Sequence, residues 1–259
     1  MLQNVKLSVI TICYNAEKEI GRTMLSVLNQ TYSSVEYIII DGLSKDRTVK
    51  EINRISNEYN NKKIKLISEP DKGIYDAMNK GIQLATGEWL CMMNAGDMFA
   101  NNCVLEKIFT NSIPEHISFL YSDFYKATSF GRYFRVKTCC DYHRKMLVHQ
   151  SVIYKKELHN RFGYYIVTPR IIISDYLFFL QVPVDETMKV DVVISKYEGG
   201  GISETGGWCK QQGLCADVVF RHGNFWLVQI NYIKWRLKTS LPKRLREWLR
   251  LRMSGVDNV

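Results

Sequence analysis

The stretch from residue 68 to residue 97 constrains the fold most, because it combines a turn, a helix, a buried strand and a polar strand end in succession. Asp71 and Gly73 interrupt the apolar run that precedes them. Apolar side chains then recur along one face of a helix, at Ile74, Ala77, Met78, Ile82 and Ala85. Gly87 ends this helix, and residues 88–93 form a mostly apolar run of strand length. A helix followed by a buried strand is the repeat of a parallel α/β sheet.

Further strands and helices alternate ahead of this stretch. Residues 6–13, 35–40 and 64–67 are apolar runs of strand length. The helix between the first two strands has an apolar stripe, and Ser44 or Asp46 can cap the helix between the second and third. Because right-handed crossovers connect parallel strands, the first hundred residues predict a three-layer sheet with helices on its faces.

Composition is typical of a soluble globular protein, with 46% hydrophobic and 24% charged residues among 259. The seven cysteines include no CxxC pair, so they indicate neither a zinc site nor a disulfide framework, and we expect reduced core thiols. The first residues lack the apolar core of a signal peptide, and no apolar run reaches the roughly 18 residues of a membrane span. We therefore expect a cytosolic protein of one large domain with an appendage.

Polar residues follow three of the predicted strands, as Tyr14 and Asn15, as Asp41 and Gly42, and as the segment 94–97. Ligands of parallel sheets bind beyond the carboxyl ends of the strands. Asp41 can accept hydrogen bonds from a base N–H or ribose hydroxyls, although Asp-Gly is equally typical of a turn. Neither GxGxxG nor GxxxxGK[ST] is present, which disfavours an NAD enzyme and a P-loop ATPase. The pattern therefore predicts a nucleotide site of another kind.

Four segments in order carry a resemblance to a known family. TICYNAE, VEYIIIDGLSKDRT, EPDKGIYDAMNKGI and ATGEWLCMMNAGD resemble the successive motifs of family 2 glycosyltransferases of the GT-A fold, in particular bacterial enzymes that build surface polysaccharides. The resemblance is strong over the first hundred residues and extends loosely through HQSVIYKK, SDYLFFLQV and YEGGGIS as far as Ser203. It implies a nucleotide-sugar donor, a divalent cation and transfer with inversion at the anomeric carbon.

The resemblance implies a Mn²⁺ or Mg²⁺ ion bridging the diphosphate, held by a D-x-D motif. Asn94, Ala95, Gly96 and Asp97 stand at that position, so Asp97 is the remaining strong ligand. Asn94 can offer its carbonyl oxygen or bind a ribose hydroxyl. Closing a strand-to-loop turn is the alternative role of both residues. His222 is a further candidate metal ligand.

The diphosphate requires donors, which residues 71–80 can supply. Lys72 precedes a helix N-terminus, where free amides and the helix dipole favour anions. Asp76 and Asn79 share a helix face and can position each other or a donor hydroxyl. Lys72 and Lys80 are alternatively solvated surface lysines. The predicted donor-binding set is Tyr14, Asn15, Asp41, Asp71, Lys72, Asp76, Asn79, Lys80, Asn94, His149 and Gln150.

An acceptor hydroxyl must lose a proton as it attacks, which requires a base opposite the leaving group. The resemblance places that base at Asp175, where family members often have Glu-Asp and this chain has Ser174 before the Asp. A helix N-cap is the alternative role of Asp175. His149 and Gln150 form a polar pair that can face either sugar, although lone histidines are more often structural. The glycine-rich residues 199–203 resemble a loop that closes over the donor site.

The C-terminal segment is basic and amphipathic. Its apolar stripe is Leu241, Leu245, Trp248 and Leu249, and its other faces carry Lys243, Arg244, Arg246 and Arg250. Such a helix suits the interface of an anionic membrane, where a lipid-linked acceptor resides. Packing back on the catalytic domain is the alternative. Nucleic acid could attract the same charge, but no recognised nucleic-acid-binding motif accompanies it.

Together these patterns predict an α/β protein with a GT-A (Rossmann-like), mostly parallel sheet flanked by helices and a C-terminal helical extension. We expect a catalytic domain at residues 1–220, whose 1–100 half binds the nucleotide sugar and whose 101–220 half binds the acceptor, and a helical segment at 221–259. The expected enzyme is cytoplasmic and peripheral on the inner face of the plasma membrane. We expect it to transfer a sugar from a nucleotide-sugar donor, for which a UDP-sugar is the favoured choice, to a glycan or polyprenyl-linked acceptor. A nucleotidyltransferase and a non-catalytic nucleotide- or glycan-binding protein remain alternatives, and homo-oligomerisation is left open.

Overall fold

The computed structural model describes residues 6–59, 64–128, 130–138, 147–198, 212, 215–216, 224–242 and 244–246. Strands and helices alternate in its first part, as β1 (Leu7–Cys13), α1 (Ile20–Leu28), β2 (Val35–Asp41), α2 (Thr48–Glu58), β3 (Ile64–Ser68), α3 (Ile74–Leu84) and β4 (Trp89–Met92). These elements lie where the apolar runs predicted them. Asp46 precedes α2 and accepts the N–H of Thr48 at 2.9 Å, whereas the side chain of Ser44 binds Asp41 instead.

The second part of the chain has shorter elements. They are β5 (Asp97–Phe99), α4 (Val104–Phe109), β6 (Phe119–Tyr121), β7 (Phe124–Ala127), β8 (Tyr133–Val136), η1 (His149–Ser151), β9 (Val152–Lys155), α5 (Leu158–Phe162), α6 (Ser174–Phe179), η2 (Val184–Glu186), β10 (Thr187–Lys189), β11 (Ser195–Tyr197) and α8 (Phe225–Ser240). Among the helices in the described ranges, none has the length and apolarity to cross a membrane.

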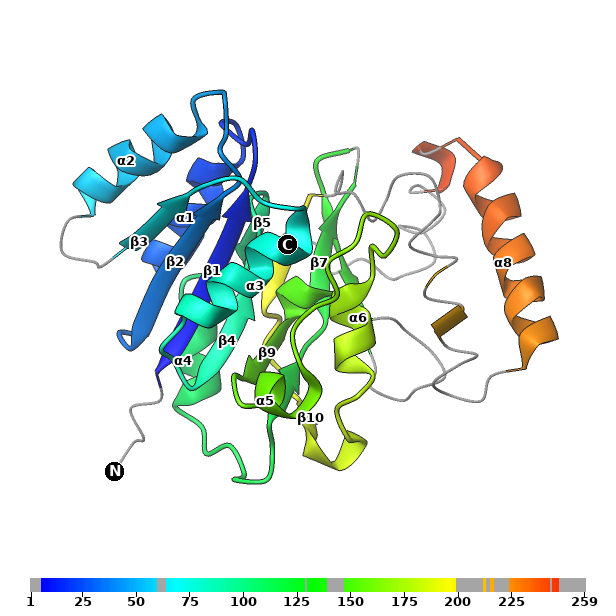
Figure 1. Cartoon of the computed structure of the whole chain (residues 1–259). Coiled ribbons are helices and arrows are strands. Elements are labelled where there is room, and N and C mark those ends of the chain that lie inside the picture. The colour runs from blue at the N-terminus through cyan, green and yellow to red at the C-terminus, as the bar shows by residue number, and fades with distance from the viewer. Residues whose placement is uncertain are drawn as a thin grey trace.

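The central sheet has seven strands in the order β10-β6-β9-β4-β1-β2-β3, and β5-β11-β7-β8 form a second, four-stranded sheet (Figure 1). β1 pairs in parallel with both β2 and β4, and β2 with β3. β9 is antiparallel to its neighbours β4 and β6. The predicted mostly parallel α/β sheet is therefore confirmed. The antiparallel strand β9 lies next to β4, the last strand within the motifs of the first hundred residues.

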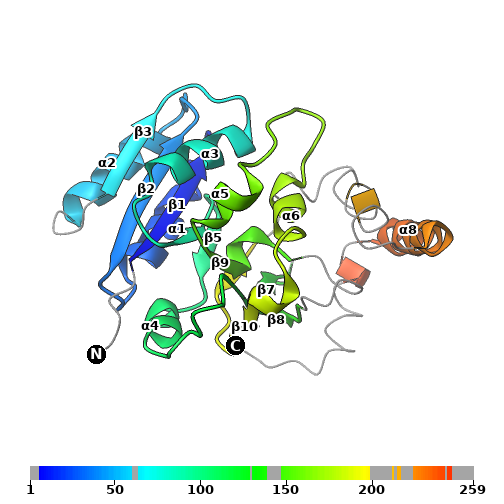
Figure 2. The same ribbon diagram turned by 60° about the horizontal axis from the view of Figure 1, so that its bottom comes forward.

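Helices cover both faces of the central sheet, and β1 is buried on both sides. Leu7 and Val9 belong to the core that includes α1, α2 and α4, whereas Ile10 and Ile12 belong to the core that includes α3, α5 and α6. In Figure 1, α3 crosses in front of the sheet and α1 lies behind it, and Figure 2 shows the same layers from a second direction. This is why residues 6–13 form a continuous apolar run rather than an alternating one.

One glycine of α3 is explained by close packing on β1. A Cβ atom added at Gly81 would collide with the side chain of Ile10, which lies on the α3 face of the strand. The helix backbone therefore approaches the sheet closely, and this fixes the position of the N-terminal turn of α3 at the carboxyl edge of the sheet.

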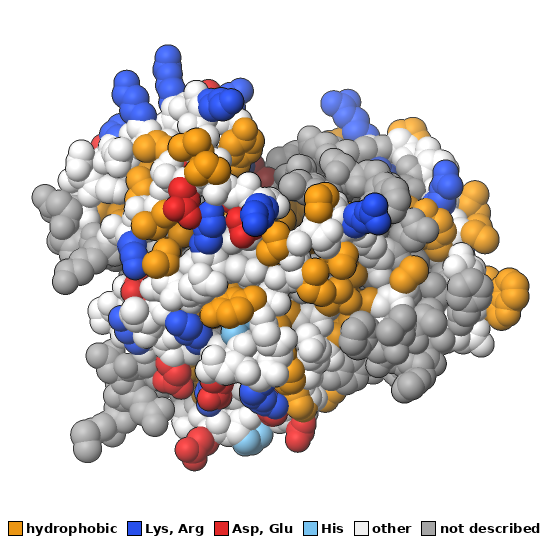
Figure 3. Space-filling view, in the orientation of Figure 1, with side chains coloured by type: hydrophobic (Ala, Val, Ile, Leu, Met, Phe, Trp, Pro, Cys, Tyr) orange, Lys and Arg blue, Asp and Glu red, His pale blue; other side chains and the backbone are white. Residues whose placement is uncertain are grey.

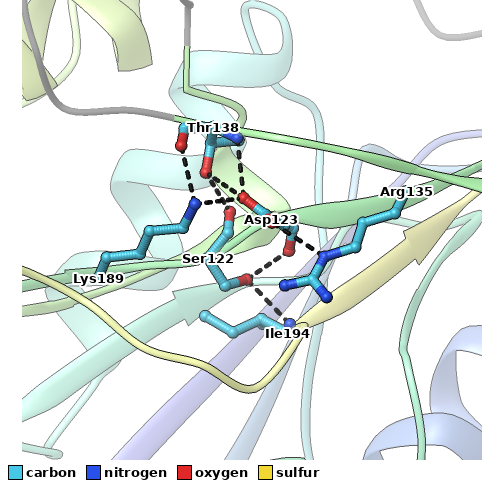
Figure 4. A network of polar contacts seen from close by, with 6 residues as sticks. All are labelled: Ser122, Asp123, Arg135, Thr138, Lys189 and Ile194. Carbon is cyan, nitrogen blue, oxygen red and sulfur yellow. Dashed lines mark hydrogen bonds and ion pairs between the residues drawn. The ribbon is translucent and has the colours of Figure 1, made fainter. Parts of the chain in front are cut away.

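A buried carboxylate joins the two sheets. Asp123 accepts hydrogen bonds from the Lys189 ammonium at 2.6 Å, Arg135 Nε at 2.9 Å and the Thr138 N–H at 2.9 Å. Lys189 ends β10 of the central sheet, whereas Arg135 lies in β8 of the second sheet (Figure 4). Burial raises the pKa of Asp123, but Lys189, Thr138 and Arg135 outweigh it and lower the pKa. The carboxylate is therefore ionised and holds the β7–β8 hairpin against the central sheet.

We predict that Asp123→Ala lowers the free energy of unfolding by about 2 kcal/mol. This is below the ~3–5 kcal/mol typical of a fully buried pair, because its cationic partners are partly exposed and regain water. Urea denaturation measures the change, with Glu58→Ala as the control because Glu58 makes an exposed ion pair with Arg54. Since folding lowers the pKa of Asp123, its contribution is present above the ordinary value of 3.8 and lost as the pH falls below it. Equal effects of the two variants would contradict this assignment.

Candidate functional site

The polar strand ends meet at one edge of the central sheet, on either side of β1. Cys13, the last residue of β1, is paired with Asp41 of β2. On the other side, the Ala95 N–H donates to the Ile12 carbonyl at 3.0 Å. The 94–97 segment and Asp41 therefore flank the same strand end, as the parallel pairing of β1 with β2 and β4 requires.

Asp41 is fully buried and its carboxylate is engaged by neighbouring groups. Its Oδ2 accepts the Ser44 N–H at 3.0 Å and the Ser68 hydroxyl at 2.6 Å, and its Oδ1 accepts the Ser44 hydroxyl. Burial and the nearby Asp41 raise the pKa of the Cys13 thiol, so Cys13 is neutral. A base or ribose would share Asp41 with these serines, and its predicted role as a nucleotide ligand stays a prediction.

The residues after β1 form a tight loop with the residues after β2. Asn15 has a left-handed backbone with φ of +48°, donates its N–H to Ser44 Oγ at 2.8 Å and accepts the Lys45 N–H at 2.9 Å. Tyr14 is 60% exposed, beside Gly42. The side chain of Asn15 is thus occupied in shaping the loop, whereas the ring of Tyr14 presents a free-standing aromatic surface at the strand ends.

Most polar residues around the start of α3 bind one another. The Lys72 N–H donates to Asp76 Oδ2 at 2.9 Å, and the Gly73 N–H donates to Asp71 Oδ1 at 2.8 Å. Lys80 donates to the Pro70 carbonyl at 2.7 Å and forms an ion pair with Glu69 at 2.9 Å. Lys80 therefore fastens the β3–α3 loop, and the exposed Lys72 remains the better placed of the two lysines to meet a diphosphate.

Asn79 crosslinks α3 to a later loop. Its amide donates to the Tyr165 carbonyl at 2.9 Å and accepts the Tyr165 N–H at 3.0 Å. Both ends of this buried amide are therefore satisfied by the backbone of one residue. Asn79 is therefore not free to bind the donor at the strand ends. Its amide instead holds residues 163–168, which precede α6 in the chain.

Four predicted site residues come together around His149. Its Nδ1 lies 3.1 Å from Asp175 Oδ2, and its Nε2 lies 3.5 Å from Asp97 Oδ2. The amide of Asn94 lies 2.9 Å from the same Nε2. Asp97 begins β5, His149 begins η1 and Asp175 lies in the first turn of α6, so three separate parts of the chain meet here. We call Asn94, Asp97, His149 and Asp175 the His149 cluster.

The charges of the His149 cluster support one another. Burial lowers the pKa of His149, but Asp175 and Asp97 outweigh it and raise the pKa to about 10. Burial likewise raises the pKa of Asp175, but hydrogen bonds from His149 and Tyr75 outweigh it and lower the pKa. At neutral pH the cluster is therefore an imidazolium between two carboxyl groups. An imidazolium donates from both nitrogens, so the buried and otherwise unsatisfied Oδ1 of Asn94 is the end of the amide that suits Nε2.

Sequence reasoning missed Tyr75, whose hydroxyl donates to Asp175 Oδ1 at 2.8 Å. Tyr75 follows Ile74 at the start of α3, and its ring is buried in the core on that face of the sheet. Its sequence position is typical of a core residue, so no local signal distinguished it. It links the start of α3 directly to the start of α6.

The remaining predicted residues are placed as follows. Gln150 is buried beside the cluster in η1, and its Oε1 has no hydrogen-bond partner in the described part of the chain. His222 and the glycine-rich residues 199–203 lie outside the described residues. Within the described ranges, no group of three or more His, Cys, Asp or Glu residues is arranged to hold a metal ion. Any cation site built on Asp97 therefore needs other oxygen ligands.

The model of the family described as glycosyl transferase family 2 matches residues 8–169. A PGL/p-HBAD biosynthesis glycosyltransferase of Mycobacterium tuberculosis H37Ra is 28% identical over 207 residues, which cover 76% of this chain and 79% of that protein. An Escherichia coli UDP-Glc:alpha-D-GlcNAc-diphosphoundecaprenol beta-1,3-glucosyltransferase, WfgD, is 31% identical over 119 residues, which cover 46% of this chain and 45% of that protein.

Solved structures share the fold. TarS of Staphylococcus aureus in complex with UDP-GlcNAc superposes with a TM-score of 0.63 at 18% identity, covering 83% of this chain and 66% of TarS. A mannosyltransferase of Pyrobaculum calidifontis in complex with GDP-Man and Mn²⁺ has a TM-score of 0.64 at 14% identity, covering 97% of this chain and 80% of that chain. The α/β architecture is that of the GT-A glycosyltransferases.

We predict opposite pKa shifts for two buried histidines. His149 should titrate near pH 10 because Asp175 and Asp97 overcome its burial, whereas burial lowers the pKa of His159 to about 4. NMR titration of the imidazole resonances measures both, and His149→Gln assigns the first. Because folding raises the pKa of His149, its stabilising effect is full below its ordinary value of 6.5 and is lost as the pH rises towards 10. Ordinary titration of His149 near pH 6.5 would show that the cluster does not exist in solution.

Proposed function

The chain belongs to glycosyl transferase family 2, and from that premise we propose that it transfers a sugar from a nucleotide-sugar donor to an acceptor hydroxyl with inversion at the anomeric carbon. The observation that carries the proposal is the His149 cluster, which joins the predicted metal ligand to the predicted base at the carboxyl edge of the sheet. Membership of this family favours a glycosyltransferase over the nucleotidyltransferase considered above.

We propose a UDP-sugar as the donor, because the similar protein WfgD is a UDP-Glc-dependent glucosyltransferase and the similar structure of TarS holds UDP-GlcNAc. The exposed ring of Tyr14 offers a surface on which a base can stack, next to the loop that Asp41 and Asn15 support. Lys72, at the N-terminus of α3, supplies positive charge for the diphosphate, and Asp71 and Asp76 hold the backbone of that turn in place.

The residues at the end of β4 fit a Mg²⁺ or Mn²⁺ ion. Asp97 supplies a carboxylate, and oxygen atoms are the ligands these cations prefer. The Oδ1 of Asn94 is a second oxygen, for which such an ion would compete with the imidazolium of His149. When bound with the diphosphate, such an ion would neutralise charge on the leaving group. The site has one carboxylate where D-x-D has two, and it lies beside a cationic His149, so we expect weaker cation binding than in a full D-x-D site.

Asp175 is the proposed base for the acceptor. Tyr75 and His149 each engage one of its oxygens, which holds the carboxylate in one orientation and keeps it ionised at neutral pH. Each oxygen retains a further lone pair that can accept a hydrogen bond from an acceptor hydroxyl. In a single displacement the hydroxyl proton passes to Asp175 while the acceptor oxygen bonds to the anomeric carbon and the bond to the diphosphate breaks, which inverts that carbon.

The acceptor is proposed to be a glycan hydroxyl on a lipid carrier at the inner face of the plasma membrane. The name of WfgD includes a diphosphoundecaprenol-linked sugar as acceptor, and that protein matches nearly half of this chain. The boundary predicted between residues 220 and 221 falls outside the described residues.

We predict that Asp175→Asn lowers the turnover number by roughly 10²–10⁴-fold, because the amide cannot accept the acceptor proton. Donor binding should persist, measured as the rise in melting temperature that a UDP-sugar causes. Tyr75→Phe keeps the carboxylate but removes one hydrogen bond to it, so it should reduce turnover by about tenfold and leave the donor shift unchanged. Parallel loss of donor binding and turnover in Asp175→Asn would remove Asp175 from the role of base.

We predict that Asp97→Ala abolishes the dependence of donor hydrolysis on Mn²⁺. The carboxylate is the strongest oxygen ligand of the proposed cation site, so its loss removes metal-dependent activity. Release of nucleoside diphosphate, measured with and without Mn²⁺, gives the result, and Glu58→Ala is a control for loss of a remote carboxylate. Metal-dependent hydrolysis that persists in Asp97→Ala would exclude this residue as the ligand.

A further inference from the structure

Helix α8 presents a row of large apolar side chains to solvent. Trp226, Ile230, Ile233 and Leu237 are 73%, 47%, 56% and 66% exposed. Their spacing of four, three and four residues places them on one stripe of the helix. Figure 3 shows hydrophobic side chains at the edge of the molecule where Figure 1 places α8. We call these four residues the outer row.

The opposite side of α8 is also apolar. Tyr232 and Trp235 are half-buried there, and their rings stack with centroids 5.8 Å apart. A helix that is apolar on two sides is typical of a buried element, whereas a surface helix keeps one polar face. We therefore expect another apolar phase or surface to cover the outer row while the protein functions.

The charge around the outer row indicates which kind of surface covers it. Lys234 and Arg236 are exposed on either flank of the row. From residue 234 to residue 252 the sequence has eight Lys or Arg and one acid, Glu247. A second copy of the chain would bring two such basic segments together, which like-charge repulsion opposes. An anionic lipid surface instead satisfies both features, because its acyl region accepts apolar side chains and its headgroups accept cations.

We propose that the outer row of α8 docks the protein onto an anionic lipid surface. Trp226, Ile230, Ile233 and Leu237 enter the boundary between headgroups and acyl chains, and Lys234 contacts the headgroup charge. This surface precedes the segment at 241–250 that the sequence favoured for the same role. The inference goes beyond the proposed transfer reaction, because it uses no residue of the donor site or the His149 cluster.

Vesicle binding by the full-length chain tests the proposal. Co-sedimentation is measured with vesicles of phosphatidylcholine alone and of phosphatidylcholine mixed with phosphatidylglycerol, at low and high salt. We expect binding to the phosphatidylglycerol vesicles, weakened by salt. Leu237→Ser should weaken it about tenfold or more, since a buried leucine is lost, and Lys234→Gln about fivefold. Leu25→Ser on α1 and Lys50→Gln on α2 are matched controls at exposed helical positions and should bind as the wild type.

Several outcomes would overturn the proposal. Equal binding to both vesicle types would exclude anionic lipid as the occupant. Equal losses in Leu237→Ser and Leu25→Ser would show that the outer row has no special role. A wild-type dimer in solution that Leu237→Ser converts to a monomer would assign the row to a second copy of the chain. An unchanged UDP-sugar melting shift in Leu237→Ser shows that the variant is folded, and separates failure of docking from failure of the proposed reaction.

Discussion

The ion-pair chain Asp175–His149–Asp97 is the interaction on which the site depends. Each link is between a carboxylate and one nitrogen of the same ring, at 3.1 and 3.5 Å. Because the ring is buried, Asp175 and Asp97 are what raise its pKa, and the hydrogen bond from the ring in turn helps to lower the pKa of Asp175. The cluster therefore joins the start of α6 to η1 and to the segment after β4, whereas η1 is already held near β4 by the pairing of β9 with that strand.

The sheet supplies the frame that makes this possible. β1 is buried on both faces and pairs with β2 and β4, so the loops after all three strands emerge at one edge. Tight packing of α3 on β1 at Gly81 brings the hydroxyl of Tyr75 within reach of Asp175. One helix thus contributes both to the proposed diphosphate site, through its N-terminus, and to the orientation of the proposed base. The proposed donor and acceptor sites would therefore share this helix.

Several site residues predicted from the sequence make structural contacts within the protein. For some of them these contacts take the place of a side chain that is free to bind a ligand. Lys80 and Asn79 bind the backbone of adjacent loops, and Asp41 is enclosed by Ser44 and Ser68. The Asn79–Tyr165 and Asp41–Ser68 contacts join residues 86 and 27 positions apart, so local spacing in the sequence could not reveal them. Tyr75 is the converse case, since a residue in an apolar pattern proved to contact the proposed base. The polar residues in the sequence indicated the region of the candidate site. Their hydrogen-bond partners in the structure then distinguished the residues that support this region from those that are exposed there.

The sequence by itself determined the α/β alternation, the strand ends that carry polar groups, and the family, because periodicity and short motifs are local properties that survive without knowledge of the fold. Only the tertiary structure decided which polar groups meet. His149 and Asp175 are 26 residues apart and Tyr75 and Asp175 are 100 apart, and their contact depends on how β9 enters the sheet antiparallel and where α6 packs. The exposure of the outer row on α8 was likewise decided by tertiary packing, because an apolar side chain has the same sequence signature whether it faces the core or the solvent.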